Sequence, residues 1–155
     1  MVGAPARPRP GPYDRIVRIE EHVEIMRSQP EVWDFVAEPL NDPQWCSKVK
    51  AVEPSGSNRW SVWHKPVPFR PPVSLTVEHL IVEPPNRLTL REEDDAGVFN
   101  VEYRLDATES GTRFTQMSEC EWKRLPKLLR PIYDRGTRRD VRAQLRSLKT
   151  VLEGD

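Results

Sequence analysis

The sequence is poor in the residues that build metal centres, disulfide frameworks and membrane spans. Its 155 residues include two cysteines, Cys46 and Cys120, and three histidines, without metal-ligand spacing. We therefore expect two reduced, buried thiols and no metal site. Lys plus Arg and Asp plus Glu both number 24, so the formal net charge is zero, which argues against nucleic acid binding. No apolar run reaches the ~20 residues of a membrane span, and no Gly-rich phosphate loop appears, so no cofactor is implied.

Proline, by contrast, is abundant, with 16 residues. Several prolines fall within the first twelve residues and predict a flexible N-terminal arm over residues 1–15, followed by a single domain over 16–155. The arm carries Arg7 and Arg9 without an apolar stretch behind them, so we expect no signal peptide and a cytoplasmic protein. A second proline cluster over residues 66–72 predicts a stiff loop between two strands.

Hydrophobic periodicity predicts an α+β domain. Val17, Ile19, Val23 and Ile25 alternate with polar residues and predict a first strand, and prolines 30 and 43 begin two short helices. Six strands follow, over residues 48–53, 59–65, 73–83, 87–93, 98–107 and 112–122. A helix over residues 126–153, restarted at Pro131, ends the chain. Short turns between consecutive strands predict a curved antiparallel sheet of about seven strands around this helix, with an internal apolar cavity.

Four motifs carry a resemblance to a known family. They are Ser28–Val36, Asn41–Trp45, Glu83–Leu88 and Ser110–Gln116. In this order the chain resembles the polyketide cyclase/dehydrase branch of the START-like (SRPBCC) superfamily over roughly residues 16 to 153. The resemblance implies a helix-grip fold. It does not settle activity, because the superfamily includes cyclases, lipid carriers, receptors and antibiotic self-resistance proteins.

Polar side chains on the inner face of the predicted sheet are the candidates for chemistry. His79 interrupts the aliphatic series Val73, Leu75, Val77 and Ile81, and it could exchange protons or be a core histidine bonded to a neighbour. Ser118, the second catalytic candidate, could orient a ligand together with Gln116, or the two could bond each other. The predicted ligand-binding residues are Trp45, Trp60, His64, Phe69, Glu92, Phe99, Tyr103, Gln116, Trp122 and Tyr133. The inward direction of Glu92 depends on a register that one bulge would reverse.

Arginines repeat along the last helix at positions 135, 139, 142 and 146, beside its apolar stripe. They form either a solvated face or a docking site for an acidic partner such as an acyl carrier protein.

These observations favour a protein that binds a small apolar, polyketide-like or aromatic molecule. Catalysis of cyclisation or dehydration by acid–base chemistry is the enzymatic version of this hypothesis. A carrier or self-resistance protein that sequesters a hydrophobic molecule is the first alternative, and a protein-binding adaptor is the second.

Overall fold

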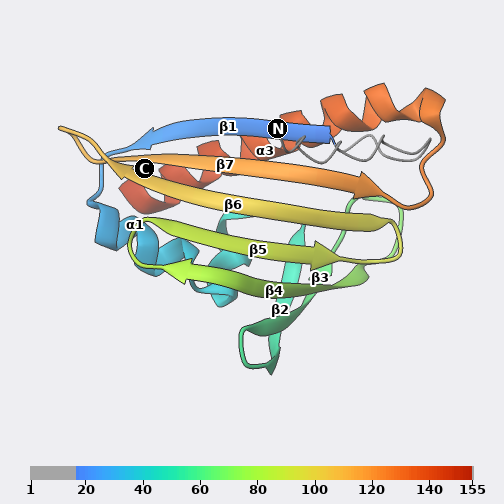
Figure 1. The fold of residues 1–155 in the computed structure, drawn as a ribbon, viewed down its shortest axis with the longest axis horizontal. Coiled ribbons are helices and arrows are strands. Elements are labelled where there is room, and N and C mark those ends of the chain that lie inside the picture. The colour runs from blue at the N-terminus through green and yellow to red at the C-terminus, as the bar shows by residue number, and fades with distance from the viewer. Residues whose placement is uncertain (1–16, 155) are drawn as a thin grey trace, which may run out of the picture.

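The computed structural model describes residues 17–154, and these form one antiparallel sheet with a long helix behind it (Figure 1). The predicted arm over residues 1–15 lies outside the described residues. The strands are β1 (Val17–Ile25), β2 (Val49–Gly56), β3 (Arg59–His64), β4 (Val73–Glu83), β5 (Arg87–Glu93), β6 (Gly97–Ala107) and β7 (Thr112–Trp122). The helices are α1 (Gln29–Val36), α2 (Asp42–Trp45) and α3 (Arg130–Glu153), with short 3-10 turns η1 (Pro39–Asn41) and η2 (Lys127–Leu129). The predicted α+β order is confirmed, and η1 is an element that the sequence did not predict.

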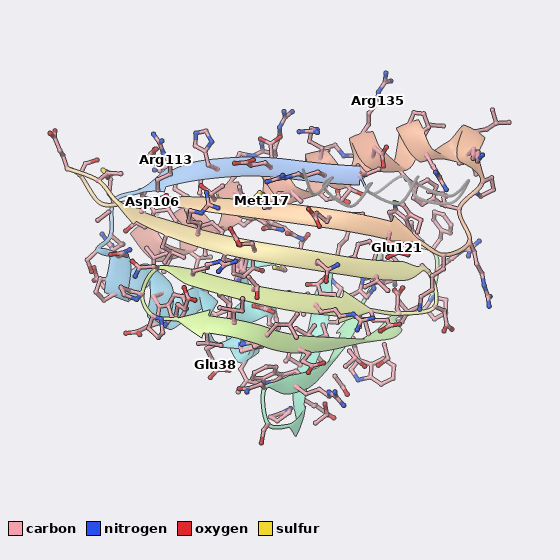
Figure 2. The ribbon with its side chains drawn as sticks, viewed as in Figure 1. Glu38, Asp106, Arg113, Met117, Glu121 and Arg135 are labelled. Carbon is pink, nitrogen blue, oxygen red and sulfur yellow. The ribbon has the colours of Figure 1, made fainter. Side chains whose placement is uncertain are left out.

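The seven strands lie in the order β1-β7-β6-β5-β4-β3-β2. Strands β2 to β7 are sequential neighbours joined by short connections, as the predicted turns require, and β1 pairs with the last strand, β7. Successive side chains of a strand point to opposite faces of the sheet. Figure 2 shows Arg113, Met117 and Glu121 on the outer face of β7, and Arg135 projecting from α3.

The two short helices follow β1 because local signals begin and end them. Glu31 in the first turn of α1 accepts hydrogen bonds from the backbone N–H of Ser28 at 2.9 Å and from its hydroxyl at 2.6 Å. Pro30 occupies the first turn, where its missing N–H costs nothing. Val32 and Trp33 are buried, so α1 packs its apolar side against the sheet.

Helix α3 packs against the inner face through one stripe. Val141, Leu145 and Leu148 are spaced at four and three residues and are all buried. Glu21 of β1 accepts hydrogen bonds from Arg138 at 3.2 Å and from Arg142 at 3.0 Å. Arg142 therefore takes part in an ion pair within the chain while its side chain stays exposed, and docking of an acidic partner on the four arginines stays a prediction.

A β-bulge in β4 corrects one expectation. The register changes between His79, which pairs with Leu90, and Ile81, which pairs with Thr89. Alternation predicted that Ile81 continues the buried series of Leu75, Val77 and His79. The bulge turns Ile81 away from that series, and its side chain is exposed. The bulge leaves Glu92 unaffected, because Glu92 pairs with Val77 on the near side of it.

The two cysteines are free and buried, as expected. Within residues 17–154, no helix is both long and apolar enough to cross a membrane.

Candidate functional site

The inner face of the sheet carries polar side chains in neighbouring rows. Glu92 lies between Val77 and Phe99 in one row, and Ser118 lies beside Val101 in the next. A third row places Gln116 between Tyr103 and Glu21. Strand pairing thus brings Glu92, Ser118, Gln116 and Tyr103 onto one wall facing α3, as the sequence predicted.

Gln116 and Ser118 contact each other but leave one polar atom free. The Gln116 amide donates to the Ser118 hydroxyl at 3.4 Å, and both side chains are buried. The Gln116 carbonyl oxygen is also buried, and no partner for it exists among residues 17–154. A buried acceptor without a partner costs about 1–3 kcal/mol, so this oxygen is suited to a donor on a bound molecule.

Trp45 supplies the complementary donor. This last residue of α2 is 1% exposed, and its ring lies 6.0 Å from that of Tyr103 and 6.3 Å from that of Phe114. Its indole N–H has no hydrogen-bond partner in the described part of the chain. The N–H faces the Asp42 carboxyl group and opposes the rise of its pKa, but the two groups do not reach hydrogen-bond geometry.

Asp42 and Glu92 are half-buried carboxyl groups whose pKa values are raised. Burial, followed by the charge of Glu92, raises the pKa of Asp42 to about 8. Burial, followed by the charge of Asp94, raises the pKa of Glu92 to about 7. Each carboxyl group can therefore hold or release a proton near neutral pH, which is the property required of a general acid or base.

Other interior groups respond to the same burial. The pKa values of Cys46 and Tyr103 are raised well above their usual ranges by burial first and then by the nearby carboxyl groups. Burial also raises the pKa of Cys120 to about 12. These thiols and this phenol stay protonated at neutral pH, so the phenol of Tyr103 is a hydrogen-bond donor and not a base.

His79 is buried at the bulge of β4, with its ring 4.4 Å from the ring of Trp60. Burial lowers its pKa, and the charge of Glu38 partly opposes that change. His79 is therefore a neutral imidazole at pH 7, able to accept a proton.

His64 lies at the other end of the ladder between β3 and β4. It pairs with Val73, six residues along β4 from His79, a separation of about 20 Å at ~3.3 Å per residue. The two histidines thus share a sheet but form no dyad. His64 lies 3.6 Å from Asp94, beyond hydrogen-bond distance, and burial lowers its pKa although Asp94 opposes the change.

An aromatic ladder leads from the inner face to the surface. The ring of Phe99 lies 5.2 Å from that of Trp122, which lies 5.6 Å from that of Tyr133. Tyr133 is exposed, and so is Phe69 in the proline loop, so the structure does not bring these two predicted ligand-binding residues to the interior wall. A surface hollow lined by Ser28 and Gly111 and another lined by Gln44 and Arg146 lie elsewhere, and the internal cavity stays a prediction.

Asp42 is the interior group that sequence reasoning missed. Its sequence signal, an acidic residue before Pro43, was interpreted only as a helix start. The Asp42 side chain is desolvated because α2, which follows η1, packs between β2 and α3. These elements are distant in the sequence, so a local sequence pattern does not predict their packing.

Seven antiparallel strands, short helices after the first strand and a long C-terminal helix define the helix-grip class of α+β proteins. Within that class, residues 17–153 match the model of the family described as polyketide cyclase / dehydrase and lipid transport, and the chain belongs to this family.

Solved structures share the fold at low identity. The Zhui aromatase/cyclase from Streptomyces sp. R1128 is 12% identical, with a TM-score of 0.75 over 90% of this chain and 94% of that one. Protein CV1439 from Chromobacterium violaceum is 15% identical, with a TM-score of 0.73 over 89% and 99%. The di-domain ARO/CYC StfQ from the steffimycin biosynthetic pathway is 13% identical, with a TM-score of 0.74 over 90% of this chain but only 51% of its own. No curated protein matches the chain.

Proposed function

We propose that the protein binds a polyketide-like or aromatic molecule between the inner face of the sheet and α3, and promotes its cyclisation or dehydration by proton transfer. The observation that carries this proposal is that two polar atoms, the Trp45 N–H donor beside Asp42 and the Gln116 carbonyl acceptor, are buried without a hydrogen-bond partner in the described part of the chain. Polyketide-like chains alternate carbonyl acceptors with acidic C–H groups and enol hydroxyls, so they offer partners to both atoms.

Membership of the polyketide cyclase / dehydrase and lipid transport family supports the same substrate class. The aromatase/cyclase names of the StfQ and Zhui structures agree with it, and at 13% and 12% identity these structures show the fold alone.

The protonation states give a direction to the chemistry. Neutral His79 accepts a proton from the carbon beside a ketone, and that carbon then forms a C–C bond to a second carbonyl. Protonated Glu92, or Asp42, donates its proton to the oxygen of the attacked carbonyl, which becomes a hydroxyl group. In the dehydration step the resulting carboxylate accepts the second proton from the same carbon, and protonated His79 donates its proton to the departing hydroxyl group, which leaves as water. Both residues thereby return to their starting protonation states, so no cofactor is needed.

The test incubates the pure protein with linear poly-ketones, fused aromatics and sterol-like lipids, and reads ligand mass, ligand isomer and intact protein by mass spectrometry. We expect cyclised or dehydrated product from the wild-type protein. We expect His79→Ala and Glu92→Gln to slow product formation while keeping ligand affinity. Gln116→Leu, which removes the unpartnered acceptor, should weaken affinity by about tenfold.

Glu119→Gln is the matched control, because Glu119 lies exposed on the outer face of β7. An unchanged ligand that co-purifies or binds in a Gln116-dependent way would contradict catalysis and make the protein a carrier. No binding of any ligand class, with affinity for a protein instead, would make it an adaptor.

A further inference from the structure

A surface at the junction of β7 and α3 has a composition unlike the rest of the molecule. The segment Arg124–Arg135, which we call the junction segment, exposes 91% of Leu128 and 66% of Ile132. Leu129 and Tyr133 are exposed beside them. Helical spacing of three and four residues places such side chains on one side of the helix start, so the exposed apolar groups are neighbours.

Cationic residues are interspersed with these apolar residues along the chain. The junction segment contains the exposed Arg124, Lys127 and Arg135 and the half-buried Arg130, against one acidic residue, Asp134. The difference in charge extends beyond the junction segment. Residues 123–154 contain ten lysines and arginines and three acidic residues. Residues 17–122 contain eleven lysines and arginines and nineteen acidic residues. The zero net charge of the chain therefore conceals a basic C-terminal element on an acidic sheet.

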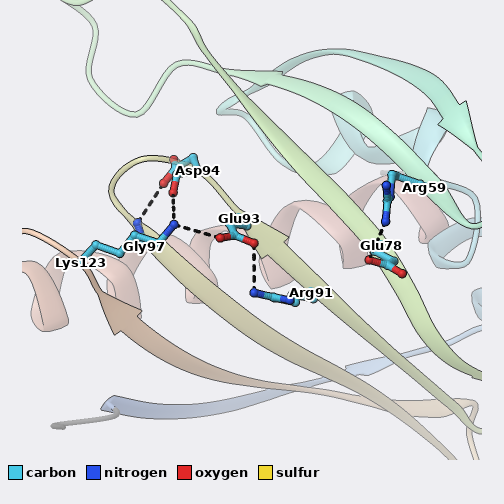
Figure 3. A network of polar contacts seen from close by, with 7 residues as sticks. All are labelled: Arg59, Glu78, Arg91, Glu93, Asp94, Gly97 and Lys123. Carbon is cyan, nitrogen blue, oxygen red and sulfur yellow. Dashed lines mark hydrogen bonds and ion pairs between the residues drawn. The ribbon is translucent and has the colours of Figure 1, made fainter.

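The base of the junction segment is bonded to a neighbouring turn. Lys123, the residue before it, donates to Glu93 at 2.9 Å and to the backbone carbonyl of Asp94 at 3.1 Å, which fixes the end of β7 to the turn between β5 and β6 (Figure 3). From this anchor the start of α3 extends past the end of the sheet (Figure 1). Leu128 and Ile132 thus follow this contact along the chain, with both side chains exposed.

We propose that the junction segment docks onto an anionic lipid bilayer surface, with Leu128 and Ile132 inserted at the acyl boundary and its arginines and lysine on lipid phosphates. Exposed aliphatic residues interspersed with cations are typical of an interfacial helix, in which the aliphatic side chains enter the acyl boundary and the cations contact lipid phosphates. The aromatic ladder from Phe99 through Trp122 ends at Tyr133, so the docked surface adjoins the interior wall.

The proposal is independent of catalysis and is tested with the full chain and lipid vesicles. Co-flotation is measured with vesicles of phosphatidylcholine alone and of phosphatidylcholine mixed with phosphatidylserine, at low and at high salt. We expect binding to the mixed vesicles, weakened by salt, and little binding to phosphatidylcholine. The double variant Leu128→Ser/Ile132→Ser should lower vesicle affinity by about tenfold or more, since it removes two inserted side chains.

Two controls locate the effect. Leu80→Ser changes an exposed leucine on β4, and Arg146→Glu changes an exposed arginine in the C-terminal half of α3. Neither should match the loss seen with the double variant, and circular dichroism should report an unchanged fold for all three.

Absence of vesicle binding by the wild-type protein would overturn the proposal. An equal loss with Arg146→Glu would also overturn it, because binding would then be unspecific attraction to α3. Salt-sensitive binding to an acidic acyl carrier protein, unaffected by Leu128→Ser/Ile132→Ser, together with no vesicle binding, would assign the surface to a protein partner.

Discussion

Glu92 shows how one position on a strand acquires unusual chemistry. It occupies an inner-face site between Val77 and Phe99, where hydrophobic residues would normally pack, and burial raises its pKa to about 7. Between about pH 4.5 and pH 7 the folded protein keeps this proton whereas the unfolded chain releases it. The stabilising effect of the protonated group is therefore complete below the unfolded pKa and is lost as the pH rises through the folded pKa.

We predict from this that Glu92→Gln changes the pH dependence of stability. Urea unfolding should show the variant gaining, relative to the wild-type protein, up to about 3 kcal/mol between about pH 4.5 and pH 8. Glu119→Gln, on the outer face, should show no such trend. A constant difference between Glu92→Gln and wild type at all pH values would contradict a raised pKa at this position.

The histidines act in the opposite direction. Burial lowers the pKa values of His64 and His79, so the unfolded chain binds protons that the folded protein does not bind below about pH 6.5. Their contribution to stability increases as the pH rises toward that value. The difference between Glu92→Gln and wild type removes the contribution of the histidines, which is equal in both proteins, and includes the fall in the Asp42 pKa that follows from loss of the Glu92 charge.

At the scale of the element, Gly136 and Gly111 differ in whether the surrounding structure has space for a side chain. A Cβ at Gly136, in the interior of α3, would have no heavy atom within 4 Å. Glycine in a helix interior costs about 1 kcal/mol relative to alanine. Gly136→Ala should raise the free energy of unfolding by up to about 1 kcal/mol, measured by urea denaturation. Ala143→Gly, at an exposed position of the same helix, should lower it by a similar amount, and a destabilising Gly136→Ala would show that space is lacking.

Gly111, in the turn between β6 and β7, gives the opposite expectation. A Cβ there would lie 2.1 Å from the carbonyl oxygen of Ile25, a backbone atom that cannot move without breaking the pairing of β1 with β7. Gly111→Ala should therefore lower the free energy of unfolding by about 2 kcal/mol or more. Thermal unfolding of Gly111→Ala beside Ser110→Ala, its exposed neighbour, checks this, and equal melting temperatures would refute it.

The order of elements followed from the sequence because each has a local signal. Alternation marks β4 to β7, and Pro30 and Pro43 mark the helix starts, so three strands, β4, β5 and β7, match the prediction at both ends. The bulge after His79 has no such signal, because Leu80, Ile81 and Val82 are all apolar and either register satisfies the pattern. The inner-face residues followed from alternation, but their neighbours across space, such as Asp42, depend on how α2 packs.

At the scale of the whole molecule, charge is separated between a basic α3 and an acidic sheet, and α3 is held partly by that attraction. Glu21 is the clearest contact, because its side chain is only 18% exposed and it accepts bonds from both Arg138 and Arg142. Further polar contacts lie at the far end of α3, where the Met26 N–H donates to Glu153 at 2.8 Å. Attraction between separated charges of opposite sign is weakened by added salt, so the folded state should lose stability as salt increases.

We predict that Glu21→Gln lowers the free energy of unfolding by about 1–2 kcal/mol at low salt and reduces the loss of stability caused by sodium chloride. Glu20 is the matched control, because it is the adjacent residue, has the same charge and is exposed on the opposite face of β1. Glu20→Gln should change stability by less than about 0.5 kcal/mol and leave the salt dependence as it is in the wild-type protein. Equal effects of the two substitutions would mean that net charge matters and the Glu21 contact does not. A salt dependence confined to Glu21 would instead show that one partly buried carboxylate couples α3 to the sheet, and would make the position of α3 over the inner face sensitive to ionic strength.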